Sequence, residues 1–292
     1  MKRISLFLLL TCLLLSPLLS SDSSNLRFVV IADTNPDIFS QKDFSVFEKE
    51  IEQINSLKPD LVINLGDLIY GHGLRKTRPQ WERYLKVIEK IEAPYYQIPG
   101  NHDIFSRASK RIYLEIFKET YTSFTFKNHH FVLLNNVEDK DWGKIGPEQF
   151  AWLKNDLENP DWEGAFVFVH VPVWDLKVRN VKPEWRKFWF DNVHPLLLKS
   201  KIKAVFAGHT HRFGPTRIYD GIHYYIAGGG GPKLHSDYIK KGGQNFFLLI
   251  EVSANGIQVN VIMENQVLSE VEADILKDDF APYYYRPINS TH

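Results

Sequence analysis

From Arg27 onward, short apolar runs rich in Val and Ile alternate with longer segments in which apolar residues recur at helical spacing. The pattern predicts a strand over 28–32 and then a helix over 44–57, in which Ile51, Ile54 and Leu57 share one face. The alternation continues with predicted strands at 61–64, 95–98, 165–169 and 202–207 and predicted helices at 81–91, 108–117, 148–157 and 185–199. Such alternation is typical of an α/β domain with substantial parallel sheet.

Other strands follow a hairpin pattern. Runs at 121–126 and 131–134 flank Lys127-Asn128-His129, and four further runs lie at 216–219, 223–226, 246–252 and 257–263. We expect the last four to form a second, mainly antiparallel portion. Since no Ser/Gly/Pro-rich linker divides residues 25–292, the sequence predicts one α/β domain with two packed mixed β-sheets flanked by helices.

The first 24 residues have a different character. Lys2 and Arg3 precede an apolar stretch over 4–19, and small polar residues over 20–24 close it. This layout predicts a secretory signal peptide and an exported protein, periplasmic or extracellular, without stable membrane insertion after cleavage. The alternative is anchoring through an uncleaved N-terminus or one lipidated at Cys12, which is the only cysteine. If residues 1–24 are removed, any metal must be held by oxygen and nitrogen ligands.

Charge narrows the choice of partner. The 292 residues contain 35 Lys and Arg against 35 Asp and Glu, so the formal net charge is zero. Binding to the phosphate backbone of a nucleic acid normally requires a basic surface. We therefore expect no nucleic-acid partner, and nothing in the sequence fixes an oligomeric state.

Metal-binding residue types follow five of the predicted strands. They are Asp33, Asp67, the run Asn101-His102-Asp103, His170, and the pair His209 and His211. The carboxyl ends of parallel strands lie along one edge of a sheet, so residues distant in sequence converge there. Carboxylate, imidazole and amide groups suit two cations about 4 Å apart, because a shared carboxylate offsets the repulsion between them. Taken singly, each residue has an ordinary turn, cap or packing role, but these roles do not explain the whole set.

The ordered motifs Gly66-Asp67, Gly100-Asn101-His102-Asp103, His170 and Gly208-His209-Thr210-His211 resemble those of calcineurin-like metallophosphoesterases. The resemblance covers about residues 28–211 and implies a four-layer sandwich fold. It also implies a centre of two metal ions, of iron, manganese or zinc. Asp67 would bridge both ions, Asp33 and His211 would bind the first, and Asn101, His170 and His209 would bind the second. A hydroxide between the metals would attack phosphorus, with His102 as general acid and Asp103 orienting it.

Two positions depart from the commonest pattern of this family. Asn35 stands where many members have a histidine ligand, two residues after the first aspartate. Tyr70, three residues after Asp67, matches the tyrosine with which the purple acid phosphatase branch binds ferric iron. Tyr70 is therefore a candidate ligand of the first metal, and a core aromatic residue is the alternative.

Residues outside these motifs have simpler interpretations. Trp174 follows His170 closely and is expected to line a substrate cleft, while His72 and His235 are expected at its rim. The run Gly228–Gly231 lacks the Lys-Ser/Thr of a phosphate-binding loop and is predicted to be a flexible or bent connection.

The sequence thus predicts a metal-dependent hydrolase of phosphomonoesters or phosphodiesters. The competing hypothesis is a non-catalytic metal- or phosphate-binding protein on a degenerate scaffold, which Asn35 motivates. Measuring metal content and hydrolysis of chromogenic phosphate esters would separate the two.

Overall fold

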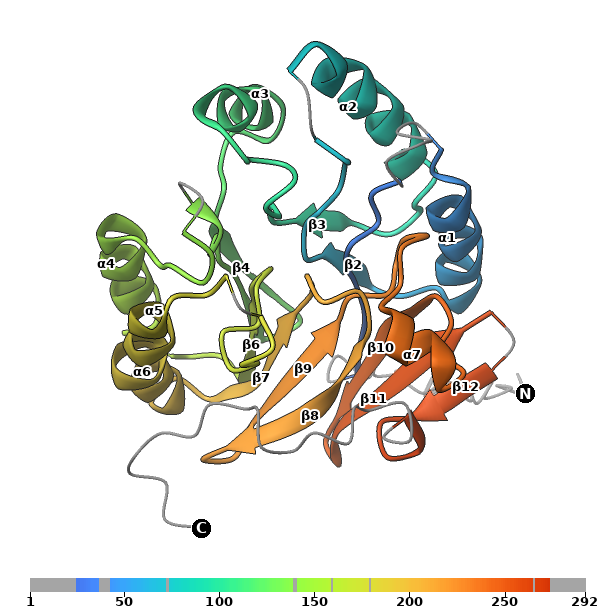
Figure 1. Cartoon of the computed structure of the whole chain (residues 1–292). Helices are drawn as coiled ribbons and strands as arrows, with labels where there is room; N and C mark the ends of the chain where they lie inside the picture. Colours follow the sequence, from blue (N-terminus) through green and yellow to red (C-terminus); the bar gives the residue numbers. More distant parts are fainter. Residues whose placement is uncertain are drawn as a thin grey trace, which may run out of the picture.

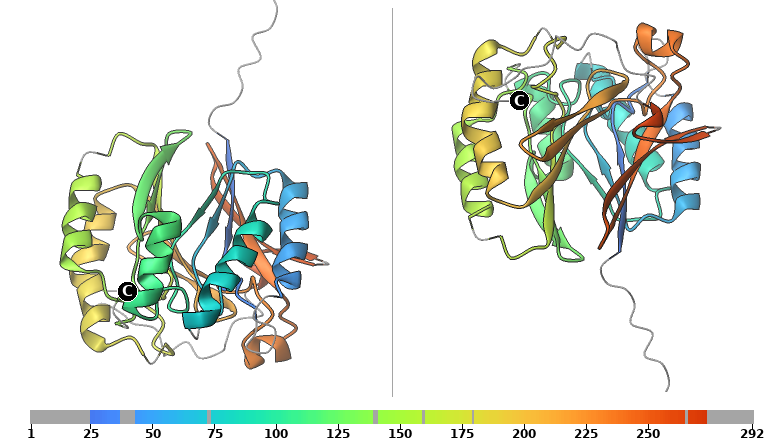
Figure 2. Two further views of the ribbon diagram at one scale, coloured as in Figure 1. Left: turned by 90° about the horizontal axis from the view of Figure 1, so that it is seen from above. Right: turned by 90° about the horizontal axis from the view of Figure 1, so that it is seen from below.

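A computed structural model describes residues 25–36, 43–71, 74–138, 141–158, 160–178, 180–264 and 266–273. The predicted signal peptide, Cys12 and His72 lie outside the described residues. Two sheets of six strands face each other, and helices cover their outer faces (Figures 1 and 2). The predicted α/β fold with two packed mixed sheets is confirmed.

The first sheet has the strand order β12-β11-β10-β1-β2-β3. Its strands are β1 (Leu26–Ile31), β2 (Leu61–Asn64), β3 (Tyr95–Gln97), β10 (Phe246–Ser253), β11 (Gly256–Met263) and β12 (Gln266–Ser269). Strands β1, β2 and β3 are parallel, whereas β10 joins β1 in the antiparallel sense. Half of this sheet is therefore built from the C-terminal part of the chain.

The second sheet has the order β4-β5-β6-β7-β9-β8. Its strands are β4 (Thr122–Phe126), β5 (His129–Leu133), β6 (Gly164–Phe168), β7 (Ile202–Ala207), β8 (Phe213–Tyr219) and β9 (Ile222–Ala227). The four central strands are parallel, and β4 and β8 are antiparallel edges. The expected separate antiparallel portion is wrong, because the C-terminal strands are divided between the two sheets.

Helices cover the outer face of each sheet (Figure 2). The helices of the described residues are α1 (Ser45–Leu57), α2 (Leu74–Ile88), α3 (Arg107–Phe117), α4 (Pro147–Asp156), α5 (Pro183–Phe188), α6 (His194–Leu198) and the short α7 (Ser236–Lys240). Helix α1 lies beside the first sheet, and α4, α5 and α6 lie beside the second. Helix α2 begins seven residues before the predicted 81–91, although it contains Pro79. A π-helical segment, Trp189–Val193, joins α5 to α6. None of the described helices is long and apolar enough to cross a bilayer.

Phenylalanine fills the space between the two sheets. The Phe28 ring of β1 meets the rings of Phe131 and Phe166 from the opposite sheet edge-on, at centroid distances of 5.3 and 4.9 Å. Val29 and Ile31 of the same strand belong to a second hydrophobic cluster, which also contains residues of α1 such as Ile51 and Ile54. Both faces of the strands are buried, which explains why they appear in the sequence as continuous apolar runs.

Candidate metal centre

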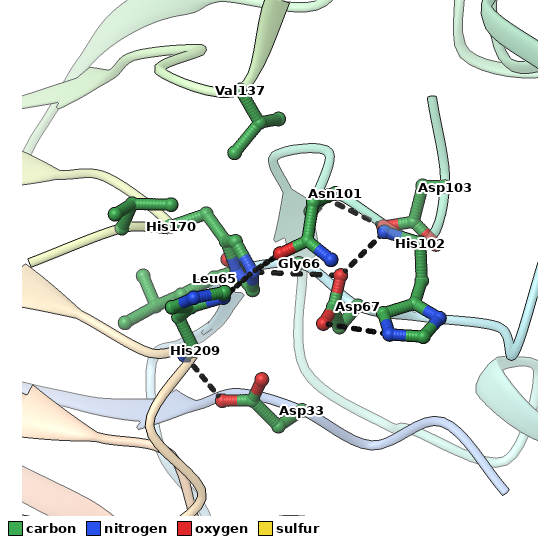
Figure 3. Close-up of polar contacts among 12 residues, drawn as sticks. Asp33, Leu65, Gly66, Asp67, Asn101, His102, Asp103, Val137, His170 and His209 are labelled. Atoms are coloured by element: carbon green, nitrogen blue, oxygen red, sulfur yellow. Dashed lines mark hydrogen bonds and ion pairs between the residues drawn. The ribbon is translucent and has the colours of Figure 1, made fainter. Parts of the chain in front are cut away.

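Loops that directly follow five parallel strands bring the candidate residues together at one end of the sandwich (Figure 3). Asp33 follows β1, Asp67 follows β2, Asn101 follows β3, His170 follows β6, and His209 and His211 follow β7. The first three come from one sheet and the others come from the other sheet. The centre is therefore formed only when the two sheets pack together.

Four of these residues have a left-handed backbone conformation, which residues other than glycine rarely adopt. The φ angles are 60° at Asp33, 54° at Asp67, 71° at His209 and 53° at His211. Such conformations cost on the order of 1–3 kcal/mol each and gather at functional sites. Here they turn each side chain toward the centre immediately after its strand.

Glycines allow the loops to approach one another. A Cβ atom on Gly100 would lie 2.2 Å from Asp67 Oδ1, and one on Gly228 would lie 2.8 Å from Asp33 Oδ2. Gly230 donates its N–H to the carbonyl of Ala32 at 2.9 Å. The run Gly228–Gly231 thus packs against the loop that carries Asp33, and close approach explains its composition better than flexibility does.

Asp67, His170 and His209 form a group whose ligand atoms all lie within 4.8 Å of one another. His170 Nε2 lies 3.4 Å from Asp67 Oδ1, 3.2 Å from Asn101 Oδ1 and 3.2 Å from His209 Nδ1. His170 Nδ1 donates to the carbonyl of Leu65 at 2.8 Å, which directs Nε2 inward. We call Asn101, His170 and His209 the buried half of the centre.

Asp33, Asp67 and His211 form a second group of the same size. His211 Nε2 lies 3.7 Å from Asp33 Oδ1, and its Nδ1 donates to the carbonyl of Lys233. The His211 side chain is 18% exposed, whereas His170 is fully buried. We call Asp33 and His211 the open half, and Asp67 is shared by both groups.

The pKa values reflect crowding of buried charge. Burial alone would lower the pKa of His170, but the adjacent Asp67 carboxylate outweighs it and raises the pKa to about 9. Burial, reinforced by His170, lowers the pKa of His209 to about 3. Burial raises the pKa of Asp33. Burial opposes ionisation of Asp67 too, but His170 and His102 hold its pKa well below the usual value.

The donor set fits metal ions. Asp33 Oδ2 accepts a hydrogen bond from the His209 amide at 2.7 Å, but its buried Oδ1 has no hydrogen-bond partner among the described residues. Asp67 Oδ1, Asn101 Oδ1 and His209 Nδ1 all converge on His170 Nε2. Burying several electron-pair donors around one point, with a carboxylate oxygen that has no partner, lowers the stability of the fold. A cation bound between these atoms removes that cost.

His102 lies beside this donor set. Its amide donates to Asp67 Oδ1 at 2.9 Å, and its Nε2 lies 4.0 Å from Asp67 Oδ2. Its Nδ1 donates to the carbonyl of Tyr70 at 2.7 Å. The Tyr70 carbonyl therefore orients the His102 ring and leaves Nε2 facing the centre.

The Asp103 carboxylate binds backbone amides of the surrounding loops. Its carboxylate is fully buried and accepts backbone N–H groups from Gly100 at 2.7 Å, Leu68 at 3.0 Å and Ile69 at 3.1 Å. Burial, with a contribution from Asp67, raises its pKa to about 7. Asp103 thus joins the loops that carry Asp67 and His102, and its role in orienting His102 stays a prediction.

Tyr70 and Asn35 both border the centre. The Tyr70 ring packs beside that of His102 at a centroid distance of 5.6 Å. Asn35 is buried, and its amide donates to the carbonyl of Asp67 at 2.9 Å. Asn35 therefore connects the Asp33 loop to the Asp67 loop through its backbone.

Sequence reasoning missed Asn136 and misplaced a tryptophan. Asn136 Oδ1 accepts the amides of His170 at 3.1 Å and Val171 at 3.0 Å, and so fixes the backbone of a candidate ligand. Trp174 is fully buried in the core, so its predicted place in a cleft is wrong. Trp142 lies near the centre instead, 4.7 Å from the His209 ring, and lines a pocket with His235. His235 therefore lies at a pocket beside the centre, and its place at the rim of a substrate cleft stays a prediction.

Comparison with known proteins agrees with this geometry. The family described as calcineurin-like phosphoesterase matches residues 26–213, which include every candidate ligand. The chain belongs to this family of phosphoester hydrolases. A probable glycerophosphodiester phosphodiesterase of Arcobacter nitrofigilis is 26% identical in an alignment of 180 positions that covers 57% of this chain and 62% of the relative. Tartrate-resistant acid phosphatase type 5 of Rattus norvegicus is 23% identical in an alignment of 259 positions that covers 75% of this chain and 77% of the relative.

Solved structures share the fold. A purple acid phosphatase from yellow lupin seeds superposes with a TM-score of 0.63 at 17% identity, over 84% of this chain and 53% of that one. A dimetal phosphatase from Danio rerio gives 0.60 at 16% identity, over 84% of this chain and 98% of that one. The chain therefore spans less than two thirds of the phosphodiesterase and of the lupin enzyme.

Proposed function

We propose that this protein hydrolyses phosphomonoesters or phosphodiesters at a centre of two metal ions. The observation that carries the proposal is the position of Asp67, the carboxylate common to both ligand groups. A shared carboxylate offsets the repulsion between two cations that lie close together. The related acid phosphatase and probable phosphodiesterase support phosphate esters as the substrate class.

The two halves supply the ligands. Asp33, Asp67 and His211 would hold one ion, with Tyr70 as a further ligand, and Asp67, Asn101, His170 and His209 would hold the other. When bound, the ions would activate water as the nucleophile and offset charge on the phosphoryl group. Iron, manganese and zinc all accept this set of oxygen and nitrogen ligands.

His102 supplies the proton for the leaving oxygen. Because Nδ1 donates to the Tyr70 carbonyl, Nε2 is the atom that faces the centre and would hold the transferable proton. Asp103 keeps the loops on either side of His102 in register. This is the arrangement expected of a positioned general acid.

Activity of the purified protein with 4-nitrophenyl phosphate and bis(4-nitrophenyl) phosphate, in added manganese, iron or zinc, tests the proposal. Asp67→Asn should abolish hydrolysis and lower metal content, since a neutral amide cannot offset two cations. Asp191→Asn, the same change at a surface ion pair with Lys187, should alter neither. Two bound metals and near-normal turnover in Asp67→Asn would contradict the two-metal assignment.

We also propose that the protein is exported, and this proposal rests on the sequence of residues 1–24 alone.

A further inference from the structure

A pocket of about 380 Å³ opens directly beside the metal centre. His209 and His211, one from each half of the centre, form part of its lining. A substrate whose phosphoryl group lies at the centre would therefore extend its organic part into this pocket. The character of the remaining lining residues then decides which phosphate esters fit.

One wall is the segment that carries Lys177 and Val178, and it is held rigidly. Asp175 Oδ1 accepts the amide of Lys177 at 2.9 Å, and Asp175 Oδ2 pairs with Arg212 Nη2 at 2.8 Å. Buried Arg186 donates to the carbonyls of Val173 and Asp175, each at 2.7 Å, and to that of Val178. The backbone at Lys177 is thus fixed by Asp175, which also offsets the charge of Arg212.

A second part of the lining is the segment from Lys233 to His235, which is attached to His211. The carbonyl of Lys233 accepts His211 Nδ1, and the amide of His235 donates to the carbonyl of His211 at 2.7 Å. A substrate that contacts this segment is therefore positioned relative to His211, a candidate metal ligand.

The lining is cationic and partly apolar. Lys177 and Lys233 bring two ammonium groups, and the described lining residues include no Asp or Glu. Half-buried Trp142 offers a flat apolar surface next to Val178 and Leu234. Trp142 is held edge-on against His209 at 4.7 Å and forms a β-bridge with Val181.

We propose that this pocket selects phosphate esters whose organic part has an aromatic body and a second anionic group. This inference rests on the proposed function. The Trp142 face would contact the aromatic ring, and Lys177 and Lys233 would bind the second anion. Esters with neutral organic parts would fill the same space without the charged contacts, so they would be poorer substrates.

The test compares 3-carboxyphenyl phosphate with its neutral isostere 3-carbamoylphenyl phosphate. We expect kcat/KM of the metal-loaded enzyme to favour the carboxylate by roughly tenfold, which is about threefold for each lysine, within the range of exposed ion pairs. Lys177→Met and Lys233→Met should each reduce the preference to about threefold, and the double variant to about one. Lys199→Met, at an exposed lysine after α6, should leave it unchanged.

Binding of the matching pair of phosphonates, 3-carboxyphenyl and 3-carbamoylphenyl phosphonate, gives a readout without turnover. Tryptophan fluorescence should show the same preference in dissociation constant, and added salt should weaken it. A ratio near one in the wild-type protein, or one that the lysine variants leave unchanged, overturns the inference. Failure to hydrolyse any aryl phosphate would instead contradict the proposed function, while the phosphonate pair would still test the pocket.

Discussion

The two halves of the metal centre differ most clearly in how His170 and His211 are buried and held. His170 is fully buried, with Nδ1 on the Leu65 carbonyl and its amide on Asn136. His211 is partly exposed, and the Lys233 carbonyl orients its ring. Asp33 keeps an oxygen that has no hydrogen-bond partner among the described residues.

The difference predicts how two bound metals would behave. A preorganised set of ligands binds its ion without further ordering of the protein, so the buried half should retain its metal most strongly. The open half has fewer secure protein ligands, and His211 is 18% exposed, so its ion should exchange more readily. It is also the half where Asn35 stands in place of a common histidine ligand.

The largest effect should come from removing a ligand of the buried half. We expect His170→Ala to lose nearly all activity, well beyond the roughly 10²-fold that changes outside a metal's ligand shell cost. His211→Ala should lose the more weakly held metal but regain part of its activity in excess metal. Metal content and turnover, each measured against metal concentration, check this order. Equal rescue of both variants by excess metal would remove the distinction between the halves.

The second prediction separates ligation from proton transfer. His102→Ala should keep both metals, because both groups of candidate ligands remain intact. Its rate should fall by about 10²–10⁴-fold for esters with poor leaving groups. Activated aryl phosphates should lose less, since their leaving oxygens need little protonation. A fall in metal content would show instead that His102 belongs to the ligand set.

The parts of the fold that follow from local pattern were predictable from the sequence. Strand β2 occupies the predicted residues 61–64, because a strand buried on both faces is a continuous apolar run. The start of α2 was not predictable, since Pro79 normally interrupts a helix. The short edge strand β12 escaped notice because exposed Val267 gives no apolar pattern.

The candidate site shows the same limit. Asp33, Asp67 and His170 could be selected because each directly follows a strand, and parallel strands bring such residues to one end. The role of Asn136 depends on contacts across two loops, which no spacing along the chain encodes. Trp142 and Trp174 could not be ranked for the same reason, because only packing decides which ring reaches the pocket.

The smallest effect should come from Tyr70, and it tests the open half directly. The Tyr70 ring lies beside His102, whose amide donates to the shared carboxylate of Asp67. A phenolate oxygen from this residue would give the open half a charged donor that favours ferric iron over softer cations. Because phenolate bound to ferric iron absorbs visible light, iron-loaded protein should be coloured and Tyr70→Phe should bleach it. Turnover with manganese should change by less than about tenfold, since Asp33, Asp67 and His211 remain. Tyr121→Phe, a control at a half-buried tyrosine that packs on Trp152, should keep the colour. If iron-loaded wild-type protein is colourless and fully active, Tyr70 serves only as packing beside His102, and the open half is completed without it.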